Sequence, residues 1–218
     1  MARARFDLPG KGMAGWLVAA GLLGAMLSSG FQTPSLKLGV VDVNRVVETS
    51  EYGKANQRTL SAMKKSREDV LEFVDTYRVL TPEQATAIRD LMVKPNRTKD
   101  EDNELERRKS EVVTANKRLQ ELSTKTNLTP EERTLLEDYA RRSQTMNETA
   151  SRWLREFTNE IQTWVDARKT DSYNRARAAI TEVAAKDGYN MIFESSVTPY
   201  GANDVSDAAL AAMNARRD

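Results

Sequence analysis

Two short apolar segments of this chain have the pattern of β-strands, and they lie at opposite ends of it. The first spans residues 38–43 (LGVVDV) and the second spans residues 190–194 (NMIFE). A strand this short is not stable alone, because its backbone donors and acceptors stay unpaired and it buries little apolar area. Each segment therefore needs a partner, either from the far end of the chain or from another copy of it.

The C-terminal segment is bounded by turn and cap signals. Gly188 precedes it, as a glycine that ends a helix does. Residues 197–200 suit a returning strand, which Pro199 restricts to a sheet edge because proline donates no backbone hydrogen bond. Ser206 followed by Asp207 indicates the start of a last short helix.

Charged sequence fills the space between the two strand segments, and its apolar residues recur three and four positions apart, which predicts helices. Helical stretches are expected over residues 50–78, 99–125 and 130–186. Thr129 and Pro130 suit the N-cap and the first turn of the third stretch. As one uninterrupted helix, that stretch would span about 84 Å at 1.5 Å per residue.

The lengths of these stretches suggest how the helical part folds. The first two together are as long as the third, so we expect a tip at residues 125–130 and an elbow at residues 79–98 on the rising side. This pairing would place Met63 opposite Tyr173. The alternative places the tip at residues 94–98 and makes the later segments a three-helix bundle.

The expected fold class is therefore mainly α with a small β head. A long antiparallel helical hairpin, a coiled-coil arm over residues 50–186, would be inserted between the strands of the head. The head would consist of residues 36–49 and 187–218. The apolar stripe of the arm is thin, which indicates weak packing between its helices.

The first thirty residues differ from the rest. Three basic residues precede an uncharged apolar run over residues 13–27, and small residues follow it. This order is typical of a secretory signal peptide, and the run is short for a membrane span. We expect a signal peptide over residues 1–30, or up to residue 33, and export of the mature chain. The alternative is an N-terminal anchor that is not removed.

Composition indicates much surface and little core. Of 218 residues, 39% are hydrophobic and 30% are charged, which is lean for a globular domain. Without residues 1–30 the chain has 30 basic and 31 acidic residues and a formal charge of −1. A net basic field for nucleic acid is missing, so no nucleic-acid partner is expected.

Catalytic chemistry has no candidate residues in this sequence. The chain contains no histidine and no cysteine, so the commonest general base, the usual nucleophile pair and the commonest zinc ligands are absent. The carboxylates of residues 100–106 lie among lysines and arginines, which indicates a solvated helix face rather than a calcium loop or an acid–base site. We expect no enzymatic activity, no cofactor and no metal.

Large apolar side chains follow one seam of the expected arm. They are Tyr139, Met146, Trp153, Phe157 and Trp164. Most residues at such spacing pack between helices. Part of this surface could instead face a cavity and contact a client, since methionine and aromatic side chains adapt to varied partners. These five residues are therefore the candidate client contacts.

At both ends the sequence resembles the Skp/OmpH family of periplasmic chaperones. The N-terminal match is residues 40–47 (VVDVNRVV) followed by residues 52–55 (YGKA). The C-terminal match begins at residues 180–185 and continues through residues 186–194 (KDGYNMIFE). It ends with Tyr200 and residues 204–206 (DVS), which lead to Leu210. The middle of the chain resembles the family only in being helical.

The resemblance implies a homotrimer whose β head assembles strands from three chains, with three helical arms that enclose a cavity. The trimerisation residues would be Leu38, Val40, Val41, Val43, Met191, Ile192, Phe193 and Val197. It also implies an ATP-independent holdase that binds unfolded outer-membrane proteins in the periplasm. A transient contact with a membrane surface is a separate expectation. This chain departs from the family in lacking a basic excess and in having longer arms.

A competing interpretation belongs to another class. The chain could be a purely structural envelope protein, a trimeric coiled-coil spacer that residues 13–27 anchor if they are not removed. The mass of the mature protein separates the two interpretations, since retention of the N-terminal segment favours the anchor.

Overall fold

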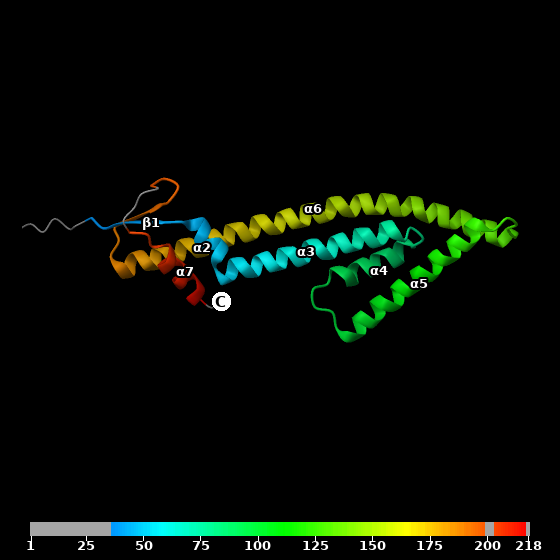
Figure 1. Ribbon diagram of the computed structural model, residues 1–218, viewed down its shortest axis with the longest axis horizontal. Coiled ribbons are helices and arrows are strands. Elements are labelled where there is room, and N and C mark those ends of the chain that lie inside the picture. Colours follow the sequence, from blue (N-terminus) through cyan, green and yellow to red (C-terminus); the bar gives the residue numbers. More distant parts are fainter. Residues whose placement is uncertain (1–35, 199–202, 217–218) are drawn as a thin grey trace, which may run out of the picture. The chain divides into compact units, whose positions relative to one another are not determined.

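The computed structural model describes residues 36–198 and 203–216, and the described chain is mainly helical with one small sheet (Figure 1). Its elements are β1 (Leu38–Val41), α2 (Val43–Thr49), α3 (Glu51–Thr76), α4 (Pro82–Val93), α5 (Lys99–Thr124), α6 (Pro130–Asp187), β2 (Met191–Glu194) and α7 (Ser206–Ala215). The chain divides into two compact units, Met1–Lys37 and Leu38–Asp218, and every element belongs to the second. The expected mainly helical class with a small sheet is confirmed. The expected signal peptide lies outside the described residues.

The two strands come from opposite ends of the chain and pair in parallel, with Leu38 opposite Met191. On its other edge, β1 contacts a C-terminal segment. The amide of Val40 donates to the carbonyl of Asn203, and the amide of Val205 donates to the carbonyl of Val40, both at 2.8 Å. β1 therefore lies between two extended segments of its own chain, although it is only 4 residues long.

The first strand is shorter than the expected range of residues 38–43, because Asp42 begins a helix. The carboxylate of Asp42 accepts a hydrogen bond from the amide of Arg45 at 2.8 Å and caps α2. Val43 consequently lies in α2 and not in a strand.

The prediction of a returning strand at residues 197–200 is wrong for residues 197 and 198, which the structure describes. Residues 195–197 form a turn, in which the amide of Val197 donates to the carbonyl of Glu194 at 3.0 Å. The turn reverses the chain directly after β2, so residue 197 cannot continue a ladder. Residues 199 and 200 lie outside the described part of the chain.

Threonine residues begin three of the helices. Thr81, Thr98 and Thr129 each accept a hydrogen bond from the amide three positions on, and the side chain of that residue reaches back to the threonine amide. This reciprocal capping box satisfies two donors at each helix start. At the far end of α6, Gly188 has a φ of 72°, the left-handed conformation that glycine adopts without strain.

Helix α3 packs on α6 in the opposite direction (Figure 1). Near the start of α3 the hydroxyl of Tyr52 donates to the carboxylate of Asp171. Farther along, Arg67 donates to Glu160 at 2.7 Å. The residue number falls on α6 as it rises on α3, so the two helices are antiparallel.

Helix α4 folds back along α3 instead of continuing it (Figure 1). Between α3 and α4, the carbonyl of Val79 accepts from Arg142 at 3.3 Å, whereas Arg89 on α4 lies 4.0 Å from Glu156. α4 therefore runs in the same direction as α6. α5 then runs outward again and connects to α6 through residues 125–129.

The expected pairing of Met63 with Tyr173 is wrong. The hydroxyl of Tyr173 donates to the Asn44 side chain on α2 at 2.6 Å, and the α3 partner of Glu160 is Arg67. The cause is that α4 folds back, so α5 starts beside α3 and not beyond its end. Equal lengths of the outward and returning helices therefore do not give their register.

Two apolar cores hold the second unit together, one in the arm (residues 50–186) and one in the head (residues 38–49 and 187–216). The buried arm residues are Val70, Val74, Val79, Leu80, Ala85, Ile88, Leu105, Val112, Leu122, Tyr139, Met146, Trp153 and Phe157. The buried head residues are Val41, Val46, Ala176, Ala179, Val183, Val205, Ala209 and Met213. Part of α6 thus belongs to the head core.

Candidate assembly and client-binding surfaces

The small sheet has an inner face and an outer face. Residues directly opposite each other in neighbouring strands point to the same side, so the register places Leu38 beside Met191 and Val40 beside Phe193 on one side. The exposed fractions of Leu38 and Met191 are 40% and 53%. These four residues are called the outer sheet face below. It is an apolar surface that residues 36–198 and 203–216 leave partly uncovered.

The inner face of the sheet packs on the head core. Val41 is buried there, and Ile192 and Val43 pack against the same cluster. A Cβ atom at Gly39 would lie 3.1 Å from the ring of Tyr189, so the residue at this position has to be small. Of the expected trimerisation residues, these inner ones hold a single chain together, while Val197 lies exposed in the turn after β2.

One edge of β2 is open. The sheet order is β1 then β2, and within the described residues no segment pairs with the other side of β2. Unpaired strand edges recruit other strands. The open edge and the outer sheet face lie on the same pair of strands, so a strand from a second chain could bury both.

A hydrogen-bonded corner ties the C-terminal segment to β1. The buried hydroxyl of Ser206 accepts from the amide of Asp42 at 2.8 Å and donates to Asp204 at 2.5 Å. The hydrogen bonds from Ser206 lower the pKa of Asp204, and the charge of Arg45 adds to this effect. The carboxylate therefore stays ionised and holds the start of α7 against the strand.

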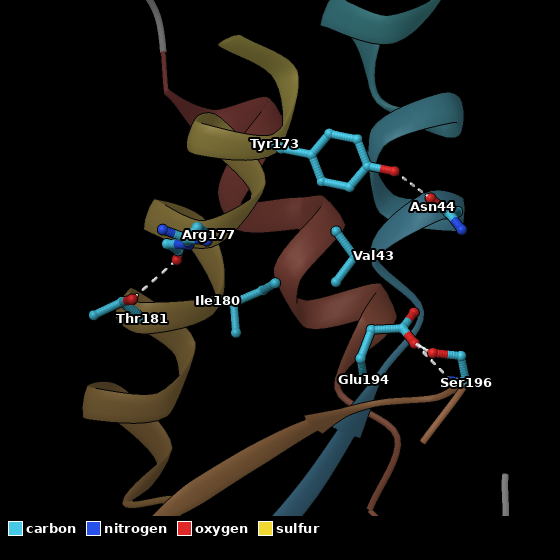
Figure 2. Close-up of a pocket in the computed structure, with 8 residues that line it drawn as sticks. All are labelled: Val43, Asn44, Tyr173, Arg177, Ile180, Thr181, Glu194 and Ser196. Atoms are coloured by element: carbon cyan, nitrogen blue, oxygen red, sulfur yellow. Dashed lines mark hydrogen bonds between the residues drawn. The ribbon is translucent and has the colours of Figure 1, made fainter. Parts of the chain in front are cut away.

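A hollow of about 430 Å³ lies between α2, α6 and the end of β2 (Figure 2). Tyr173 from α6 points across it to Asn44 on α2. At its lower end Glu194 accepts hydrogen bonds from the hydroxyl and the amide of Ser196, which lower the pKa of Glu194. Arg177 lines the hollow from α6.

The five candidate client contacts differ in burial. Tyr139, Met146, Trp153 and Phe157 are buried in the arm core, between α6 and the helices that pack on it. This placement assigns the four side chains to packing within one chain. Trp164 alone is partly exposed, and it lines a second hollow at the junction of α2, α3 and α6.

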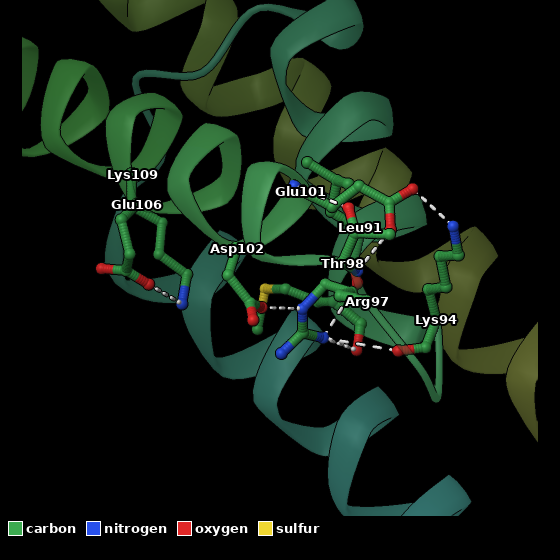
Figure 3. Close-up of polar contacts among 9 residues, drawn as sticks. Leu91, Lys94, Arg97, Thr98, Glu101, Asp102, Glu106 and Lys109 are labelled. Atoms are coloured by element: carbon green, nitrogen blue, oxygen red, sulfur yellow. Dashed lines mark hydrogen bonds and ion pairs between the residues drawn. The ribbon is translucent and has the colours of Figure 1, made fainter.

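The elbow is held by charged side chains around the α4–α5 connection (Figure 3). The guanidinium of Arg97 donates to the carbonyl of Leu91 at 3.0 Å and to Asp102 on α5 at 2.6 Å. Lys94 pairs with Glu101. Cations near a helix C-terminus satisfy its last carbonyls, so Arg97 joins the end of α4 to the start of α5. The sequence signal for this contact, a basic residue after a helix end, is weak.

The described part of the chain has neither a metal-binding cluster nor a membrane-spanning helix. Within residues 36–198 and 203–216, no group of three or more carboxylates could hold a metal ion. None of the helices in these ranges is long and apolar enough to cross a bilayer.

A family model described as "Outer membrane protein (OmpH-like)" matches residues 37–213. The chain belongs to this family, the Skp/OmpH-like proteins, which confirms the resemblance found at the two chain ends. The family consists of periplasmic, non-enzymatic chaperones for outer-membrane proteins. No curated protein sequence matches the chain.

Proposed function

We propose that this protein is an ATP-independent periplasmic holdase, which binds unfolded outer-membrane proteins between the helical arms of a homotrimer and prevents their aggregation. Family membership supports the chaperone class. The observation that carries the assembly is the exposed pair of Leu38 and Met191 on the outer sheet face.

Assembly follows from the energetics of the head. The head core stabilises the inner face of the sheet, but one edge of β2 is unpaired within the described residues. The outer sheet face also leaves apolar area in water. Adding strands from two further chains would pair the edge of β2 and bury Leu38, Val40, Met191 and Phe193. A closed ring of three would leave no edge for further addition.

The proposed cavity between the arms and exposed apolar side chains on them support client binding. Clients in the unfolded state expose apolar side chains and unpaired strand segments, and a cavity between arms covers both without sequence-specific contacts. Four of the five candidate client contacts are buried, so Trp164 is the one that we propose to contact clients. Leu154 on α6 is 55% exposed and is an additional apolar side chain that a client could contact. Weak contacts at several points would hold a client and still release it.

The function is tested by diluting a urea-unfolded outer-membrane barrel protein into buffer with the purified signal-free chain and following light scattering without nucleotide. We expect aggregation to be suppressed at about one trimer per client. Unchanged scattering at this ratio and in several-fold excess would exclude the holdase. Bovine serum albumin at equal mass is the control for non-specific suppression.

Assembly is tested by placing charges on the outer sheet face. Leu38→Glu with Met191→Glu is expected to convert the trimer to monomers in sedimentation velocity, because the introduced carboxylates would be buried without partners. Leu154→Glu changes an equally exposed residue on the arm and is expected to leave the trimer intact. A trimer that survives the double change would refute this interface. Val41 is unsuited to the test, since it belongs to the core of the single chain.

A further inference from the structure

Two hollows adjoin on one side of α6. The first is the hollow of Figure 2, and the second, of about 300 Å³, is the one that Trp164 lines. Asn44 and Tyr173 line both hollows, and their hydrogen bond of 2.6 Å lies between them. The two hollows together are called the root groove, because they lie where the arm joins the head.

The root groove is long enough for an extended peptide. Its lining on α6 runs from Trp164 to Thr181 at intervals of one to four residues. At 1.5 Å per residue this distance is about 25 Å. An extended chain rises by about 3.3 Å per residue, so a segment that reaches both hollows, past the contact of Tyr173 with Asn44, needs roughly seven or eight residues.

The walls of the root groove are apolar in the part around Trp164. Val47 on α2, Leu60 on α3 and Val165 on α6 line this part with Trp164, and all of them keep partial exposure. These side chains can bury one or two aliphatic or aromatic side chains of a bound segment. Each buried side chain contributes favourably to the free energy of binding, because its apolar area is removed from water.

One buried donor in the groove has no acceptor. The Nδ2 atom of Asn56 is buried and makes no hydrogen bond within the described chain. A buried amide without a partner is unfavourable, and native proteins rarely leave one unpaired. A rotation of the Asn56 side chain would present this donor to a backbone carbonyl of a bound peptide.

Cations predominate along the α6 side of the groove. Lys169 and Arg177 line it and take part in none of the ion pairs found among the described residues. Arg168 lies over the ring of Trp164, 5.9 Å from its centroid, and also donates to the hydroxyl of Tyr52. The carboxylates that line the groove are Glu48 and Glu194, of which Glu194 already accepts from Ser196. With three cations and two carboxylates, the lining has a net charge of +1, which favours an anionic ligand.

We propose that the root groove binds an extended segment of unfolded polypeptide in which apolar side chains alternate with acidic ones. Apolar side chains enter beside Trp164, a backbone carbonyl accepts from Asn56, and carboxylates pair with Lys169 and Arg177. The proposal rests on the holdase function and names the client segment that it recognises. A local patch of this kind would let a chain without a net basic charge bind acidic segments.

The test uses a fluorescein-labelled peptide of about eight residues that alternates phenylalanine and valine with glutamate, and measures its anisotropy with the signal-free protein. We expect binding, and at least about tenfold weaker binding of the same peptide with lysine in place of glutamate. The double change Lys169→Glu with Arg177→Glu should weaken binding of the glutamate peptide by about tenfold or more, two ion pairs being lost. Asn56→Leu, which keeps the shape and removes the donor, should weaken it several-fold.

The matched control is Lys117→Glu with Arg155→Glu, which changes net charge equally at exposed positions outside the groove. It should leave peptide binding unchanged. Equal loss in both double variants would overturn the proposal, as would absence of peptide binding to a protein that still suppresses barrel aggregation. That second result would leave the holdase function standing. A change in the sedimenting mass of the variant Lys169→Glu with Arg177→Glu would also overturn the root-groove proposal, because the groove would then be a contact between copies of the chain.

Discussion

Arg67 on α3 and Glu160 on α6 form a two-point ion pair across the arm. The Nε atom of Arg67 lies 3.2 Å from Oε2 of Glu160 and the Nη2 atom lies 2.7 Å from Oε1. The guanidinium is almost fully buried and also donates to the carbonyl of Met63 at 3.1 Å. A buried charge needs such partners, so the pair fixes the register of α3 on α6.

Removal of the carboxylate should therefore destabilise the arm. Glu160→Gln is expected to lower the free energy of unfolding by about 1–2 kcal/mol, because Arg67 keeps its backbone acceptor but loses its counter-charge. Urea unfolding followed by circular dichroism measures the change. The control is Asp69→Asn, which breaks an exposed pair with Lys65 and should leave the midpoint unchanged. Equal shifts in the two variants would show that the buried pair has no special role.

The two arm tryptophans should respond differently to truncation. Trp153 is 1% exposed, with the guanidinium of Arg89 4.9 Å from its ring centroid, whereas Trp164 is partly exposed. Trp153→Ala should lower the free energy of unfolding by about 3–5 kcal/mol, and Trp164→Ala by about 1 kcal/mol. The same unfolding measurement compares them. A larger loss at Trp164 would contradict the assignment of Trp153 to the arm core.

Replacement of two glycines by alanine is expected to destabilise the chain to different extents, for steric reasons. A Cβ atom at Gly53, in the first turn of α3, would lie 2.0 Å from the carbonyl oxygen of Val47, while nothing lies within 4 Å of one at Gly188. Gly53→Ala should destabilise the chain by more than about 3 kcal/mol, because backbone atoms of α2 would have to move. Gly188→Ala should cost about 1–2 kcal/mol, from its positive φ alone. Thermal unfolding ranks the two, and a Gly53→Ala protein as stable as the wild type would refute the close approach of α2 and α3.

The contact between Tyr52 and Asp171 should make stability depend on acid pH. The hydroxyl of Tyr52, and then the guanidinium of Arg175, hold the pKa of Asp171 below its ordinary value. Because the folded pKa lies below the unfolded one, the stabilisation is complete above the unfolded pKa of about 3.9 and is lost as pH falls through the folded pKa. Wild type should exceed Asp171→Asn in stability by a constant amount at neutral pH, and the difference should shrink below about pH 4. A difference that stays constant down to about pH 2 would contradict the lowered pKa.

Local chemistry made the boundaries of the long helices and the positions of β1 and β2 predictable from sequence. Thr129 and Pro130 indicated the start of α6, Gly188 indicated its end, and both signals act within one helical turn. The register of the helices was not predictable in the same way. Apolar periodicity tells which face of a helix is buried, but not how far one helix slides along another. Here the fold-back of α4 decides that offset.

The binding surfaces were only partly predictable for a related reason. Alternation of apolar residues gives Leu38 and Met191 a shared side of the sheet once their register is known. The seam residues Trp153 and Trp164 look alike in sequence, yet Trp153 lies in the arm core that α4 helps to form while Trp164 lines a groove. Which of them stays accessible depends on tertiary packing, and that packing has no local sequence signal.

The central claim is that this chain holds unfolded outer-membrane proteins as a trimer. Sedimentation velocity tests it most directly, with the chain lacking residues 1–30 mixed with a urea-unfolded barrel protein in the absence of nucleotide. We expect a soluble complex in which one client sediments with three copies of the chain. A client that pellets as aggregate, while the chain sediments as it does alone, would contradict the claim.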